Sequence, residues 1–126
     1  MVSDETSASH ILLVEDEAML RELAAENLLD AGFRVLEAGD GTAGLEALRS
    51  DARIDVLLSD IKLPGMDGYD LAEAAKALRP ELKVILMTGY APSPLPPGLE
   101  RMVYRVLQKP FEIEALPGMI ADALQS

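Results

Sequence analysis

Five polar residues at the ends of short apolar runs carry groups suited to accepting and holding a phosphoryl group. Glu15 and Asp16 follow residues 11–14, Asp60 follows 54–59, Thr88 follows 84–87, and Lys109 follows 106–108 directly before Pro110. Three carboxylates, a hydroxyl and an amine are thus available. Three acids in one cleft repel one another unless a cation joins them, and hard divalent cations take oxygen ligands.

The apolar runs explain how these side chains could meet. Short apolar runs bounded by turn residues are typical of buried strands in a parallel sheet. In open α/β sheets the ligand crevice lies outside the carboxyl ends of the strands. We therefore expect the five polar side chains to converge at one edge of such a sheet.

The intervening segments predict helices between the strands, and hence a doubly wound α/β fold. Residues 19–31 have helical spacing and end at Gly32, and Asp40 is placed to cap a helix that ends near Ser50. The expected strands are 11–14, 34–38, 54–59, 83–87 and 104–107, and the second of them is expected at an edge of the sheet. The remaining expected helices are 69–78 and 113–124, and Pro117 is expected to interrupt the last helix or to delay its start.

Residues 91–98 interrupt this alternation, because they contain four prolines. Proline costs about 3 kcal/mol inside a helix. The fourth helix of the fold is therefore expected to be shortened or absent, with at most a short turn over 99–102.

Composition limits the function classes. The 126 residues suffice for one domain, predicted as 10–126 after a flexible lead-in over 1–9. A net charge of −11 argues against nucleic-acid or anionic-membrane binding, and the absence of cysteine excludes disulfides and zinc–cysteine sites. No apolar stretch approaches the roughly 20 residues that span a bilayer. A cytoplasmic location is the default expectation.

Four motifs together resemble the receiver domain of the two-component response regulator family, including the receivers of hybrid sensor kinases. They are Leu13–Glu17, Ser59–Gly68, Met87–Gly89 and Lys109–Phe111. Each motif alone is weak, but all four occur in order over a resemblance that runs from about His10 to Leu124. The resemblance implies a flavodoxin-like, five-stranded parallel sheet with strand order 2-1-3-4-5.

The resemblance also implies a role for each site residue. Asp60 would accept the phosphoryl group, while Glu15, Asp16, Asp60 and the backbone carbonyl of Lys62 would hold Mg²⁺. Thr88 would donate its hydroxyl to a phosphoryl oxygen, and Lys109 would pair with the phosphoryl group. The Lys109–Pro110 peptide would be cis.

The implied function is a signalling switch rather than an enzyme, apart from slow self-catalysed phosphotransfer and autodephosphorylation. A histidine kinase or histidine phosphotransferase would donate the phosphoryl group, and an unknown downstream protein would read it. We expect such a switch to act without an effector domain of its own. An aspartyl phosphate can be hydrolysed, so the signal would erase itself.

Two departures from the family pattern bear on signalling. Val106 occupies the position three residues before the lysine where such receivers carry Tyr or Phe, and Tyr104 is expected on the same face of the strand. Tyr104 could replace the missing aromatic or only pack on the sheet. Lys62 and Tyr90 are expected at the site entrance, where they could tune water access.

Other interpretations stay open from sequence alone. The chain could be a receiver excised from a hybrid sensor histidine kinase, or, more remotely, a Mg²⁺-dependent aspartyl-phosphate phosphohydrolase. The latter class has an Asp-x-Asp motif after the first strand, where this chain has Glu15-Asp16-Glu17. Each motif taken alone also has a purely structural interpretation. Glu15, Asp16 and Glu17 could serve merely to cap a helix, and Lys109-Pro110 could be a plain turn.

Overall fold

The computed structural model describes residues 8–89 and 95–126. The elements in chain order are β1 (His10–Val14), α2 (Ala18–Asp30), β2 (Arg34–Ala38), α3 (Gly41–Arg49), β3 (Val56–Asp60), α4 (Gly68–Leu78), β4 (Lys83–Thr88), the 3-10 turn η1 (Leu99–Arg101), β5 (Arg105–Gln108), the 3-10 turn η2 (Ile113–Ala115) and α5 (Leu116–Leu124).

The five strands form one sheet in the order β2-β1-β3-β4-β5, with every neighbouring pair parallel. This confirms the strand order that the family resemblance implied and the edge position expected for residues 34–38. The register pairs Val14 with Ser59 and Asp60 with Met87, so the ends of β1, β3 and β4 lie at the same edge of the sheet.

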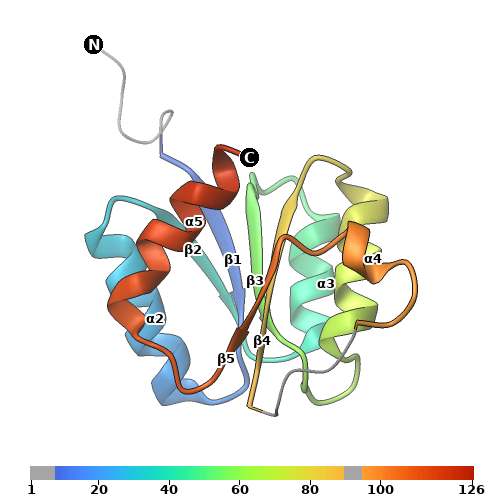
Figure 1. Ribbon diagram of the computed structural model, residues 1–126, viewed down its shortest axis with the longest axis horizontal. Coiled ribbons are helices and arrows are strands. Elements are labelled where there is room, and N and C mark those ends of the chain that lie inside the picture. The colour runs from blue at the N-terminus through green and yellow to red at the C-terminus, as the bar shows by residue number, and fades with distance from the viewer. Residues whose placement is uncertain (1–7, 90–94) are drawn as a thin grey trace.

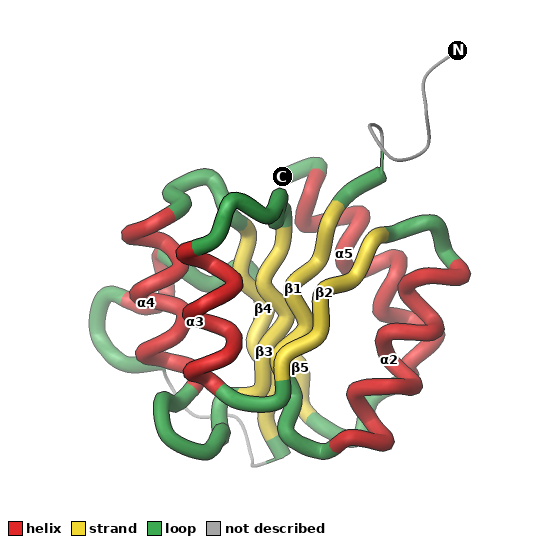
Figure 2. The backbone as a smooth tube through the Cα atoms, turned by 180° about the vertical axis from the view of Figure 1, so that it is seen from behind, coloured by secondary structure: helices red, strands yellow, loops and turns green. Residues whose placement is uncertain are grey.

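Helices cover both faces of the sheet, as Figures 1 and 2 show: α2 and α5 lie on one face, α3 and α4 on the other. In β1, which is buried from Ile11 to Val14, alternate side chains point to opposite faces of the sheet and pack in the two layers. Ile11 and Leu13 pack with Ile120 of α5, whereas Leu12 and Val14 pack with Leu71 of α4. An apolar layer therefore packs against each face of the sheet, and the polar groups lie at its carboxyl edge.

The link between β4 and β5 departs from the helix–strand alternation as expected. Among the described residues of this link, 95 and beyond, the only helical element is η1. Leu99 at its start is buried against the α3 and α4 layer. The prediction of a shortened fourth helix is confirmed for this part, while residues 90–94, which include Tyr90 and half of the proline-rich stretch 91–98, lie outside the described residues.

Local signals set the ends of several helices. The Asp40 carboxylate accepts a hydrogen bond from the N–H of Ala43 at the start of α3, and Asp67 accepts one from Asp70 at the start of α4. Gly32, after α2, has a φ of 99°, a conformation that glycine adopts without steric cost. Pro117 lies in the first turn of α5, so this helix starts late rather than being interrupted.

Several strands are shifted by one or two residues from the expected bounds, and two of these differences bear on the site and on the lead-in. β3 starts two residues later and ends one residue later than predicted, so Asp60 is its last residue rather than the first residue after it. Ser9, assigned above to the lead-in, accepts a hydrogen bond from the N–H of Arg34 through its carbonyl. Regular pairing with β2 therefore reaches back to Ser9.

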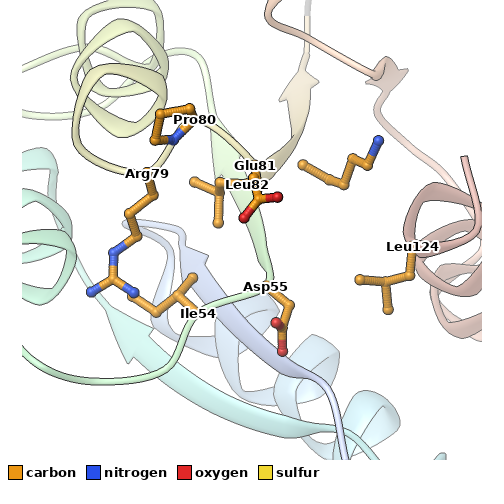
Figure 3. Close-up of a pocket in the computed structure, with 8 residues that line it drawn as sticks. Ile54, Asp55, Arg79, Pro80, Glu81, Leu82 and Leu124 are labelled. Carbon is orange, nitrogen blue, oxygen red and sulfur yellow. The ribbon is translucent and has the colours of Figure 1, made fainter.

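The opposite, amino-terminal edge of the sheet has a different character. A cleft of about 360 Å³ lies there, and Asp55, Arg79 and Glu81 are among the residues that line it (Figure 3). The guanidinium of Arg79 donates to the carbonyls of Leu48 and Ser50, so it ties the end of α4 to the end of α3. No helix within residues 8–89 and 95–126 is long and apolar enough to cross a membrane.

Candidate functional site

The three acids predicted to meet do so at the carboxyl edge of the sheet. Glu15 and Asp16 occupy the turn between β1 and α2, and Asp60 ends β3. One carboxylate oxygen from each lies within 4.8 Å of the other two. Glu15 and Asp60 are buried, whereas Asp16 is exposed.

Lys109, which follows β5, joins the two buried acids. Its Nζ lies 2.8 Å from Oε1 of Glu15 and 2.9 Å from Oδ1 of Asp60. The Lys109 side chain is 23% exposed, against 1% for Glu15 and 9% for Asp60, so the ammonium group lies over the carboxylates from the solvent side. The Lys109–Pro110 peptide is cis, as the resemblance implied.

Thr88 and Lys62 line a cavity of about 320 Å³ that also exposes Asp60. Thr88 ends β4, and its carbonyl accepts a hydrogen bond of 2.7 Å from the N–H of Lys109. Among the described residues, the three acids, Lys62, Thr88 and Lys109 therefore lie together at this edge, as expected. The cavity lies next to the Asp60 carboxylate.

Burial and mutual interaction shift the pKa values of Glu15, Asp60 and Lys109. Burial and the neighbouring Glu15 carboxylate raise the pKa of Asp60 to about 7, even though Lys109 opposes the shift. Burial alone would raise the pKa of Glu15, but hydrogen bonds from Asp60, Lys109 and the N–H of Glu17 hold it below its usual value. Burial would lower the pKa of Lys109, but its two carboxylate partners raise it. A cation near Asp60 would favour its ionised form and so oppose this upward shift of its pKa.

This donor set fits a hard divalent cation. Three carboxylates from two strand ends offer oxygen atoms close together, while one lysine pairs with two of them. Glu15, Asp16 and Asp60 are the residues that could hold such an ion, and Lys62 lines the cavity beside Asp60.

The backbone under Asp60 is closely packed. The N–H of Ile61 donates to the carbonyl of Met87, and the carbonyl of Ile61 accepts from Gly68 at 2.7 Å. A Cβ at Gly68 would overlap the carbonyl oxygen of Asp60 and would lie 2.6 Å from Cα of Ile61. Only glycine fits where α4 begins, so the start of α4 holds the end of β3 in place.

One contact at the site was not predicted from sequence. Arg21, on the first turns of α2, donates from Nη1 to the carbonyl of Glu15 at 2.7 Å and pairs with Glu37 at 3.4 Å. An arginine on a helix carries no local signal that it will reach back to the preceding turn, because the contact depends on how α2 and β2 pack.

The face that carries Tyr104 and Val106 is open. Tyr104 is 39% exposed and Val106 is 37% exposed. Tyr104 is therefore not held as a buried aromatic beneath the site. Whether it takes the place of the aromatic missing at Val106 stays a question for experiment.

Comparison with known proteins gives a consistent result. The family model described as the response regulator receiver domain matches residues 11–121. The response regulator receiver protein CpdR of Brucella abortus is 35% identical over 115 residues, which is 90% of this chain and 95% of CpdR. The transcriptional regulatory protein FixJ of Bradyrhizobium diazoefficiens is 33% identical over 123 residues, and the chain spans only 58% of its length.

Solved structures agree in fold. The receiver domain from the hybrid histidine kinase CckA superposes with a TM-score of 0.80 at 36% identity, over 93% of this chain and 100% of that domain. The fold, the four motifs in their order, and the family match over nearly the whole length lead to one assignment: the chain belongs to the response regulator receiver domain family.

Proposed function

We propose that the carboxylate of Asp60 is the phosphoryl acceptor of this receiver domain, formed by residues 10–126. The observation that carries the proposal is the arrangement around Asp60. A buried carboxyl with a raised pKa lies between Glu15 and Lys109 and borders a cavity lined by Thr88 and Lys62. Members of the family are signal transducers rather than conventional enzymes.

The proposed reaction is a phosphoryl transfer with a balanced outcome. An Asp60 carboxylate oxygen forms a bond to phosphorus while the nitrogen–phosphorus bond of a phosphohistidine breaks, and the imidazole nitrogen keeps the electron pair. The transition state of such transfers is loose, so positioning and charge neutralisation dominate catalysis. Hydrolysis by water then releases inorganic phosphate and restores the Asp60 carboxylate.

Each neighbour of Asp60 has a role in this scheme. Lys109 pairs with phosphoryl oxygens as a compact positive charge, and the Thr88 hydroxyl donates to another phosphoryl oxygen. Glu15, Asp16, Asp60 and the carbonyl of Lys62 would hold Mg²⁺, which would neutralise charge on the carboxylates and the phosphoryl oxygens. Asp60, in its ionised form, would be the nucleophile.

Receiver domains accept phosphate from histidine kinases or phosphotransfer proteins, and we propose a donor of this kind here. Similarity to the CckA receiver does not by itself favour the alternative of a receiver excised from a hybrid kinase. The cytoplasmic location and the downstream protein stay predictions.

Intact-mass spectrometry tests the proposal. The purified chain is incubated with a small acyl phosphate and Mg²⁺, with and without excess chelator. We expect one added phosphoryl group on the wild type, none on Asp60→Asn, and none with chelator. Asp51→Asn, at an exposed position after α3, is the matched control and should be labelled like the wild type. Labelling of Asp60→Asn would contradict the assignment.

A further inference from the structure

Arg21 links three segments around the acidic turn. Its Nη1 donates to the carbonyl of Glu15 at 2.7 Å, its Nε lies 3.4 Å from Oε1 of Glu37 at the end of β2, and its guanidinium lies against the backbone of Gly39. The N–H of Glu15 donates to the carbonyl of Ala38 at 3.1 Å. The backbone of Glu15 is thus held on both sides, by β2 and by α2.

The carbonyl that Arg21 holds belongs to the peptide bond between Glu15 and Asp16. A peptide unit is planar, so fixing its carbonyl direction also fixes where the next Cα lies. Asp16 is exposed, and within the described part of the chain Glu17 makes no side-chain capping hydrogen bond at the start of α2. The turn is held instead by the Glu17 N–H, which donates to Oε2 of Glu15 at 3.1 Å, and by Arg21, which holds the Glu15 carbonyl.

We propose that Arg21 is a positioning residue for the metal site, which orients the Glu15–Asp16 peptide so that both carboxylates face Asp60. This inference rests on the proposed function, because it assumes that Glu15, Asp16 and Asp60 bind Mg²⁺. Arg21 itself touches neither the metal nor the phosphoryl group. Hydrogen bonds from a charged donor are stronger than those from a neutral donor. Mutation of a residue that orients metal ligands typically lowers metal affinity about 10- to 100-fold.

The charge of Arg21 and its positioning role predict opposite effects of its removal on Mg²⁺ affinity, so the measurement separates them. Arg21 carries a positive charge close to the acids, so its removal should strengthen Mg²⁺ binding if charge were its only effect. If positioning dominates, its removal weakens Mg²⁺ binding. Lysine keeps the charge but cannot reach Glu15 and Glu37 together, because its ammonium lacks the planar fork of arginine.

The experiment is a calorimetric titration of the metal-free chain with Mg²⁺ alone, for the wild type, Arg21→Met, Arg21→Lys and Arg79→Met. Arg79 is the matched control, since its guanidinium also donates to backbone carbonyls, those of Leu48 and Ser50, but at the amino-terminal edge of the sheet. Circular dichroism at the titration temperature confirms that each variant is folded, and chelator is present for a parallel urea titration of stability.

We expect Arg21→Met to weaken Mg²⁺ binding at least tenfold and Arg21→Lys to weaken it severalfold. Arg79→Met should lower stability but keep the wild-type dissociation constant. A folded Arg21→Met that binds Mg²⁺ as tightly as the wild type, or more tightly, overturns the inference. If Arg21→Met does not fold, Arg21→Lys decides, and wild-type affinity in that variant overturns it. A wild type that binds no Mg²⁺ overturns the proposed function as well.

Discussion

At the scale of single residues, Asp60 is a buried carboxyl whose pKa is raised to about 7. Burial is the main cause and the neighbouring Glu15 carboxylate adds to it, while Lys109, which both acids share, opposes the shift. We therefore expect a bound cation to stabilise the ionised form of Asp60.

Asp60→Asn should make the metal-free chain more stable at pH 8. The pKa of Asp60 is near 3.8 in a free chain and about 7 when folded, so the folded state binds the proton more tightly. The contribution of Asp60 to the free energy of unfolding therefore falls as pH rises from about 4 to about 7. Urea unfolding in chelator at pH 5 and pH 8 should show the stability advantage of the variant growing between the two values. A variant less stable than the wild type at pH 8 would refute this description of Asp60.

Lys109→Gln should destabilise the metal-free chain by roughly 3 kcal/mol, because removal of one partner leaves buried charge uncompensated. Mg²⁺ should stabilise this variant more than the wild type, since the metal no longer competes with the ammonium group. Thermal unfolding with increasing Mg²⁺ measures both effects. If Mg²⁺ raises the Tm of the wild type and of Lys109→Gln by the same amount, Lys109 and the metal do not share the same acids.

The residue types of the site could be predicted from sequence, but their energetics could not. Glu15, Asp60 and Lys109 stand out because each follows an apolar run. The pKa of Asp60 depends on its burial and on atoms far away in the chain, and no spacing rule supplies either. The role of Arg21 likewise depends on the packing of α2 against β2.

At the scale of elements, the close approach of α4 to the end of β3 fixes the backbone that carries Asp60. Gly68→Ala should cost about 2 kcal/mol, in the range of overpacking substitutions, because the new Cβ overlaps the carbonyl oxygen of Asp60. The rate of phosphorylation by an acyl phosphate should also fall, since the displaced backbone moves the acceptor. Urea unfolding measures the loss of stability, and intact-mass spectrometry over time measures the rate of phosphorylation.

Gly118→Ala is the matched control for this prediction. Gly118 lies in α5, and a Cβ there would meet no described atom within 4 Å beyond its own helix and chain neighbours. Alanine should stabilise the helix by about 0.5–1 kcal/mol and leave phosphorylation unchanged. A Gly68→Ala protein with wild-type stability and labelling would show that the contact between α4 and β3 does not hold the acceptor.

The elements themselves could largely be predicted because each has a local cause. Alternating burial defines β1, Asp40 and Gly32 mark helix ends, and the prolines after β4 prevent a regular helix. The ends of β3 and α5 were less certain for physical reasons. The apolar residue Ile54 lies before the start of β3 at Val56, so hydrophobicity alone does not mark that end, and Pro117 permits either a late start or an interruption.

At the scale of the whole molecule, the predicted domain 10–126 can be tested by truncation. Deleting residues 1–7 should leave stability unchanged. Deleting residues 1–9 should cost about 1 kcal/mol, the typical value of one hydrogen bond, because the carbonyl of Ser9 pairs with the N–H of Arg34. Equal free energies of unfolding for the two truncations would place the start of the domain at His10, as first predicted.

The account as a whole depends on which carboxylate receives the phosphoryl group. Borohydride reduces an aspartyl phosphate to homoserine, so tandem mass spectrometry of the reduced, digested chain locates the modified residue directly. We predict homoserine at position 60 alone, and none when Mg²⁺ is withheld. Homoserine at position 16, or at any other aspartate in place of Asp60, would contradict the account.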